Sequence, residues 1–160
     1  MIDEIQELLK TSVSGVFETM LKMGIRGIPL TPDTMTDEPH IAGSVGFIGE
    51  VTGVVYIYCS AGFAKTVTSL ALEMPIEDVE GDELINDSMG ELANMIVGSL
   101  KAKLVEKGHS CILTIPSIVR GSHFSIEATS TTTRRVMCFR CQESSNLVVE
   151  ILIKPAEGKD

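Results

Sequence analysis

The sequence predicts a single α/β domain over residues 1–160, in the α+β form, with helices packed on a mixed or antiparallel sheet. Two long amphipathic helical patterns predict the helices, one at the start of the chain and one in its middle. Each is followed by β-strand patterns that indicate a hairpin. The chain has 160 residues, of which 44% are hydrophobic and 22% charged, an ordinary composition for one soluble globular domain.

The first half is predicted to hold a helix, a loop and a β-hairpin. The helix is expected over residues 3–23, where apolar residues recur at helical spacing, and Gly24 is expected to stop it. Three prolines and several Thr and Asp residues mark 27–39 as a loop. The hairpin is expected over 42–59, with its turn at the segment GEVTG. Its second arm is apolar on both faces, which is typical of a central strand covered on each side.

A short helix and a second helix–hairpin unit complete the predicted order. Ser60 is expected to cap the short helix over residues 61–74, and Pro75 to end it. Because the second unit has the same order of helix, connection and hairpin as the first, the two halves are expected to form a degenerate repeat. The tail, 155–160, is expected to fray. The strands of the second unit are expected over 111–119, with Pro116 at a bend or an edge, and over 123–129, 134–141 and 146–154.

The long helix in the middle, residues 82–108, is the element around which the rest is organised. Asp82 is the expected N-cap, and Gly108 is expected to take the left-handed position that ends the helix. One side of the helix carries an apolar stripe that predicts its contact with the core. The stripe consists of Leu84, Ile85, Met89, Leu92, Ala93, Ile96, Leu100 and Leu104.

The opposite side of this helix is predicted to meet a partner. Gly90 flanks that side and Gly98 lies within it, and each glycine costs about 1 kcal/mol of helix stability relative to Ala. A glycine gains something only where another surface approaches closely. We therefore predict that Gly90, Gly98 and Lys101 bind a partner; the alternative is a merely solvated face. Five residues share an arc of about 80°: Asp87, Glu91, Asn94, Gly98 and Lys101.

Charge and cysteine content narrow the classes of function. The formal net charge of −9 disfavours nucleic acid and membrane insertion and favours a partner with a positive or metal-bearing site. The acidic start is unlike a signal peptide, so a cytoplasmic location with four reduced cysteines is expected. Cys138 and Cys141 have a spacing found in zinc sites. On a strand, however, they point to opposite faces, so no metal site is expected.

The pattern Asp87-x3-Glu91-x2-Asn94, followed 22 positions later by Pro116, resembles the signature helix of the CheC/CheX/FliY chemotaxis phosphatases. The hairpin GFIGEVTGVVYIYCS before a helix is also similar to that family. With one signature, the chain is most similar to the CheX branch. The resemblance implies a CheC/CheX-like fold, a homodimer, and removal of phosphate from a CheY-like response regulator. It assigns Glu91 and Asn94 to the inserted catalytic pair, with Asp87 and Pro116 in supporting positions.

The chemistry of the pair fits this role. A phosphorylated receiver domain holds its aspartyl phosphate with its own Mg²⁺ and Lys, so the helper protein needs no cofactor. The uncharged amide of Asn94 can hold the attacking water, which is worth on the order of 10²-fold in rate. Glu91 is suited to pairing with the receiver's Lys. The alternative is a non-catalytic adaptor that binds a receiver domain or a flagellar switch component through the same helix.

Overall fold

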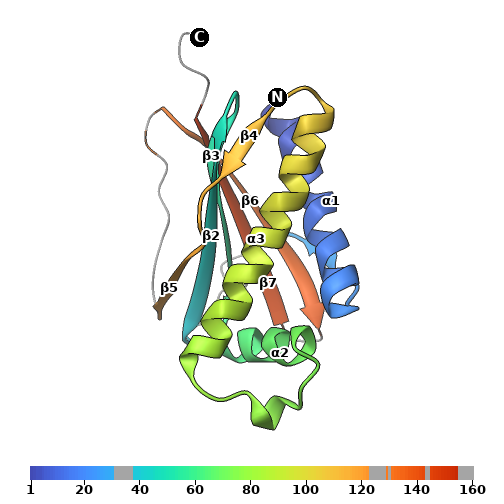
Figure 1. Cartoon of the computed structure of the whole chain (residues 1–160), viewed down its shortest axis with the longest axis vertical. Helices are drawn as coiled ribbons and strands as arrows, with labels where there is room; N and C mark the ends of the chain where they lie inside the picture. The colour runs from blue at the N-terminus through green and yellow to red at the C-terminus, as the bar shows by residue number, and fades with distance from the viewer. Residues whose placement is uncertain (31–37, 123–128, 130, 143–144, 155–160) are drawn as a thin grey trace.

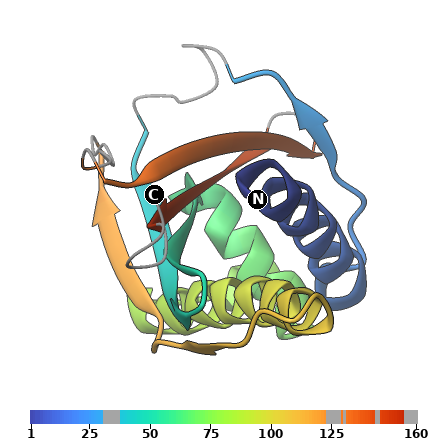
Figure 2. The same ribbon diagram turned by 90° about the horizontal axis from the view of Figure 1, so that it is seen from above.

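The computed structural model describes residues 1–30, 38–122, 129, 131–142 and 145–154 (Figure 1). In this part of the chain, three α-helices pack on one face of a seven-stranded antiparallel sheet, as predicted, and the sheet curves around them (Figure 2). The helices are α1 (Ile2–Leu21), α2 (Ala61–Ala71) and α3 (Asp82–Glu106), with a short 3-10 turn, η2 (Ile76–Asp78), before α3. The strands are β1 (Arg26–Ile28), β2 (His40–Gly49), β3 (Thr52–Ser60), β4 (Cys111–Leu113), β5 (Ser117–Gly121), β6 (Thr133–Gln142) and β7 (Ser145–Lys154).

The sheet is built from two hairpins joined through their second arms. β2 pairs with β3 and β6 pairs with β7, and β3 lies against β7 with Tyr56 opposite Glu150. The strand order is β1-β6-β7-β3-β2, and both β4 and β5 pair with β2. β3 is therefore the central strand that its apolar sequence predicted. On the helix side it contributes Val55 and Ile57 to the core, and on the other side Tyr58 is also buried.

The face of the sheet away from the helices contains a buried polar network. Glu150 is only 2% exposed. Its Oε1 accepts a hydrogen bond of 2.5 Å from the hydroxyl of Tyr58, and its two oxygens accept bonds of 3.0 Å from Nε and Nη2 of Arg134. Burial and the bond to Glu150 raise the pKa of Tyr58. Arg134 thus compensates the charge of a carboxylate in its own chain.

Two helix ends differ from the predictions. α1 turns out of the helix at Lys22 (φ 53) and not at Gly24, because Met23 returns to the core, where it is 8% exposed. α3 is capped by Gly81 (φ 81), and Asp82 is the first helical residue, without a side-chain capping bond. The left-handed Gly108 (φ 87) is confirmed.

The short helix α2 begins as predicted and ends early. Ser60 Oγ accepts a hydrogen bond of 3.1 Å from the backbone N–H of Phe63, so the predicted cap is confirmed. The helix ends at Ala71 and not at Met74, because the chain turns at Glu73 (φ 52). Met74 N then donates to Ser69 O, and the Ser69 hydroxyl donates to Met74 O, which closes this turn before Pro75.

Two strand predictions are also corrected. Residues 26–28, of which 27 and 28 were assigned to a loop, form β1, where Ile28 lies opposite Cys138 of β6. The strand predicted over 111–119 divides into β4 and β5, which lie on either side of Pro116. Most of the strand predicted over 123–129, and the tail 155–160, lie outside the described residues.

The four cysteines are free and buried. Cys138 packs with Tyr58 on the outer face of the sheet, whereas Cys141 joins the core on the helix side, so the two thiols lie on opposite faces as predicted. Among the described residues, no group of His, Cys, Asp and Glu side chains is placed to hold a metal ion. None of the helices in the described part of the chain is long and apolar enough to cross a membrane.

Candidate functional site on helix α3

Helix α3 crosses the sheet obliquely between α1 and the β4–β5 edge (Figure 1). It lies very close to β2, because Gly43 of β2 has no side chain to hold it away. A Cβ on Gly43 would lie 3.2 Å from the carbonyl oxygen of Met89 and 3.5 Å from Ala93 Cβ. The apolar stripe of α3 is buried from Met89 to Leu104 and half-buried at Leu84 and Ile85, and the opposite side of the helix faces outward.

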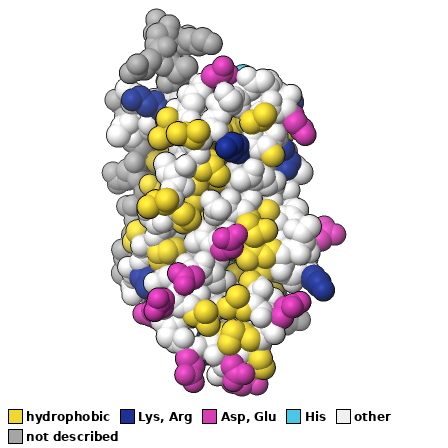
Figure 3. Space-filling view, in the orientation of Figure 1, with side chains coloured by type: hydrophobic (Ala, Val, Ile, Leu, Met, Phe, Trp, Pro, Cys, Tyr) yellow, Lys and Arg dark blue, Asp and Glu magenta, His cyan; other side chains and the backbone are white. Residues whose placement is uncertain are grey.

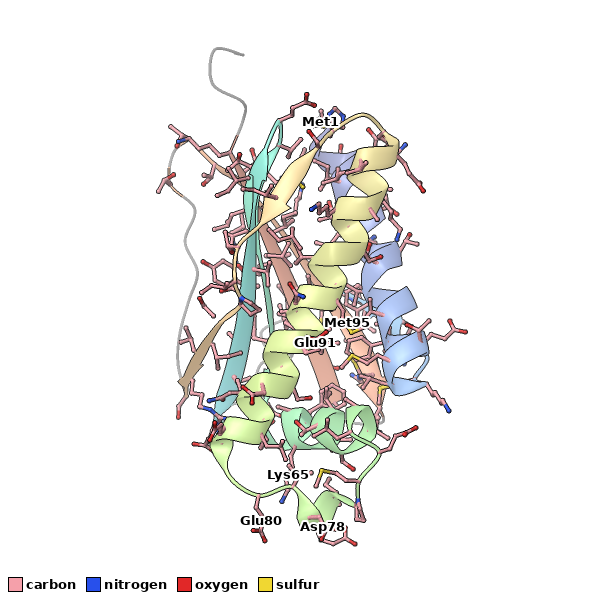
Figure 4. The ribbon with its side chains drawn as sticks, viewed as in Figure 1. Met1, Lys65, Asp78, Glu80, Glu91 and Met95 are labelled. Carbon is pink, nitrogen blue, oxygen red and sulfur yellow. The ribbon has the colours of Figure 1, made fainter. Side chains whose placement is uncertain are left out.

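The predicted catalytic pair lies on that outward side. Glu91 is exposed midway along α3 and is turned away from the sheet (Figure 4). Asn94 is half-buried. In a regular helix, residues three apart are separated by about 4.5 Å along the axis and about 60° around it, so their side chains are neighbours on the surface. The structure therefore brings Glu91 and Asn94 together where another molecule can reach both.

Pro116 supports this part of α3 from the side. It lies between β4 and β5, and a Cβ on Gly90 would be 3.5 Å from Pro116 Cβ. Gly90 is buried under this contact. The glycine at position 90 predicts that another surface approaches closely, and in the structure that surface is the chain's own Pro116, which leaves Gly90 little area for a partner. The supporting position predicted for Pro116 is consistent with this packing.

The other predicted residues are spread along the same outward side. Asp87 is exposed one turn before Glu91. Gly98 is half-buried, and a Cβ there would meet no atom within 4 Å, so the space above it is open. Lys101 is half-buried, one turn further along the helix. These three remain candidate partner contacts by position.

Thr114 and Arg120 fix the strands beside the site, and neither was predicted from the sequence. Thr114 binds β2 twice: its Oγ1 accepts a bond of 2.8 Å from Gly46 N, and its own N–H donates to Gly46 O at 2.9 Å. Arg120 of β5 donates through Nε to Asn86 Oδ1 of α3 at 2.9 Å. The first pair is 68 positions apart in the sequence and the second 34, so no local pattern signals either one.

The charge around the site is negative. Acidic side chains gather over the end of the molecule where α2, η2 and the start of α3 lie (Figure 3). Arg120 adds little positive charge, because its Nη1 lies 3.6 Å from Asp82 Oδ1. The outward side of α3 is thus suited to a partner with a positive group. The exposed acids of this region include Asp78, Glu80, Asp82, Glu83, Asp87 and Glu91.

The predicted pair lies on an outward side of the helix. Two of the surface pockets among the described residues lie beside β1 and β6, lined by residues such as Arg26 and Ile28, and neither of these includes the outward residues of α3. An exposed carboxylate and a half-buried amide on the outward side of a helix can act chemically on a group that a partner carries in a cavity of its own. This arrangement is suited to inserting two side chains into another protein.

Comparisons with known proteins identify relatives of the chain. The family described as chemotaxis phosphatase CheX matches residues 41–140. A CheY-P phosphatase CheX from Thermotoga maritima is 28% identical over 126 residues, which cover 76% of this chain and 80% of that protein.

Solved structures of similar proteins share the fold. The chemotaxis protein CheX from Vibrio vulnificus is 24% identical, with a TM-score of 0.78, over 94% of this chain and 97% of its own. CheX from Borrelia burgdorferi, solved in a complex with CheY, BeF3 and Mg²⁺, is 19% identical, with a TM-score of 0.74, over 92% and 96% of the two chains.

Proposed function

The chain belongs to the CheX family of chemotaxis phosphatases, and from this premise we propose that it accelerates dephosphorylation of a CheY-like response regulator. The relative from Thermotoga maritima is named a CheY-P phosphatase, and the relative from Borrelia burgdorferi forms a complex with CheY, which supports a partner of this type. The observation that carries the proposal is the outward placement of Glu91 beside Asn94 on α3.

Asn94 is proposed to position the attacking water. A side-chain amide offers an acceptor oxygen and two donor hydrogens in a fixed geometry, and it carries no charge that would repel the phosphoryl oxygens. The receiver supplies the aspartyl phosphate, Mg²⁺ and a Lys, so the protein adds geometry and no cofactor of its own. A water held in line with the scissile P–O bond raises the rate by about 10²-fold, or roughly 2.7 kcal/mol.

Glu91 is proposed to dock the helix. Its exposed carboxylate can pair with the Lys of the receiver site, and this charge-assisted contact would orient α3 so that Asn94 meets the water. Asp87, Gly98 and Lys101 would contact the rim of the receiver. Pro116 acts through its packing on Gly90, which holds this part of the helix and the β4–β5 edge together.

The test is single-turnover loss of phosphate from a phosphorylated CheY-like receiver. We expect Asn94→Ala to abolish the acceleration while affinity for the receiver stays within about threefold of wild type. We expect Glu91→Ala to weaken binding as well, whereas Glu106→Ala, at the end of the same helix, leaves both unchanged. Full activity in Asn94→Ala would overturn the water-positioning role. Binding by the wild type without acceleration would indicate the adaptor function.

We further propose that the protein acts as a homodimer in the cytoplasm, the compartment of a soluble receiver partner. Light scattering of the purified protein measures the mass directly. A dimer would have twice the chain mass of 17.3 kDa, and a mass equal to that of one chain would exclude the dimer.

A further inference from the structure

Ile115 is the large hydrophobic side chain most open to solvent in the described part of the chain. It is 85% exposed, compared with 66% for Ile112 and 53% for Val119 on the neighbouring strands. Singly exposed apolar residues are common and carry no meaning by themselves. Ile115 differs from such residues because it lies between two residues that are fixed to the rest of the protein, and this position suits it to contact a partner.

Its two neighbours are anchored to different elements. Thr114 exchanges hydrogen bonds with Gly46 of β2, and a Cβ on Gly46 would lie only 3.1 Å from Thr114 Cγ2. Pro116 packs on Gly90 of α3. The backbone of Ile115 is therefore held on both sides while its side chain stays in solvent. An apolar residue presented in this way loses little conformational entropy when a partner covers it.

The contacts with α3 place Ile115 beside the catalytic pair. Arg120 meets Asn86 and Pro116 meets Gly90, so the strand runs antiparallel to the helix. The rise of one residue in extended chain is about 3.3 Å, and the rise of one residue in a helix is about 1.5 Å. One extended residue therefore spans the length of about two helical residues. Ile115 precedes Pro116 and so lies about two residues beyond Gly90 along α3. That level is between Glu91 and Asn94.

We propose that Ile115 is an apolar anchor for the phosphorylated receiver domain and helps to determine which receiver the protein accepts. This inference rests on the proposed function. The occupant is a CheY-like receiver that presents an apolar patch beside its positive phosphorylation site. The exposed acids Asp87 and Glu91 are complementary in charge to the positive phosphorylation site of the receiver. Ile115 would then cover the apolar patch of the receiver beside that site. Apolar anchors next to charged contacts commonly dominate the energy of such interfaces.

The experiment measures binding to a CheY-like receiver of the source organism loaded with beryllofluoride and Mg²⁺, which requires no hydrolysis. We expect Ile115→Ser to weaken binding about tenfold or more, the loss expected for one buried Ile side chain. Ile115→Leu should restore the affinity to within about threefold of wild type. The matched control is Ile112→Ser, because Ile112 lies on the face of the sheet away from α3 and should bind as wild type.

The outcomes separate this inference from the proposed function. Binding of Ile115→Ser within twofold of wild type, or an equal loss in Ile112→Ser, overturns the anchor. A wild-type protein that binds the loaded receiver without accelerating loss of phosphate removes the catalytic role of Asn94 and leaves the Ile115 result intact. A wild-type protein that binds no receiver removes both. Equal melting temperatures for the variants show that a loss of binding is local.

Discussion

Pro116 covers Gly90 of α3 so closely that a Cβ on the glycine would lie 3.5 Å from Pro116 Cβ. This distance is an ordinary van der Waals contact, so a methyl group fits, whereas a larger side chain at this buried position would press on Pro116. The contact joins the helix that carries Glu91 and Asn94 to the connection that carries Ile115. The two parts of the proposed receiver-binding surface are therefore in direct contact.

Two substitutions at Gly90 should separate the effect of helix propensity on stability from the effect of the contact with Pro116. Gly90→Ala is expected to raise the free energy of unfolding by up to about 1 kcal/mol, because Ala favours the helix and its methyl group fits. Gly90→Leu is expected to lower it by about 1–3 kcal/mol by displacing Pro116, and to reduce phosphatase activity. Denaturant unfolding measures both. Gly98→Leu is the control for stability, since the space above Gly98 is open. Equal stability of Gly90→Leu and Gly90→Ala would contradict the contact.

The role of Glu91 in docking should appear in the salt dependence of the reaction. An exposed ion pair is screened by salt, so the KM of the wild type for phosphorylated receiver should rise as NaCl is added. Glu91→Gln should have a higher KM at low salt and a shallower rise. Glu106→Gln, about 22 Å further along the helix, should follow the wild-type curve. An unchanged slope in Glu91→Gln would show that the carboxylate does not pair with the receiver.

Long periodic patterns could be predicted from the sequence, and contacts between distant segments could not. The bounds of α3 were predicted to within two residues, because its apolar stripe repeats over about six turns. The outward placement of Glu91 and Asn94 follows from the same period. β1 was missed because three residues carry no period and form a strand only by pairing with β6. The partners of Thr114 and Arg120 are set by the fold and leave no local pattern.

The ion pair between Arg134 and Glu150 should stabilise the protein, whereas the adjacent Arg135 should contribute little. Arg134→Ala removes the guanidinium from a carboxylate that is 2% exposed, and we expect a loss of about 2 kcal/mol in the free energy of unfolding, a value reduced for the partial exposure of Arg134. Arg135 lies 3.7 Å from the exposed Asp3. Arg135→Ala should therefore change stability by less than about 0.5 kcal/mol. Equal losses in the two variants would contradict a specific role for Glu150.

The buried cysteines should make the protein less stable at alkaline pH. Burial raises the pKa of the Cys59 thiol, and it raises the pKa of Cys141 from the ordinary value of 9.0 to about 12. Above pH 9 these thiols ionise in the unfolded chain and stay protonated in the native one. The unfolded state then binds fewer protons, so the free energy of unfolding falls as pH rises.

Each such thiol should remove about 1.4 kcal/mol between pH 8 and pH 10, so the pair accounts for about 2–3 kcal/mol. Denaturant unfolding under reducing conditions, repeated across this range, measures the loss. The double variant Cys59→Ala/Cys141→Ala is expected to be less stable at pH 7, because two buried sulfurs are removed, and to show a smaller decline toward pH 10. The ionisation of the thiols is measured by the slope of the free energy of unfolding against pH, and not by its absolute value at pH 7. A double variant whose stability falls as steeply as that of the wild type would show that other groups, such as Tyr58, cause the decline.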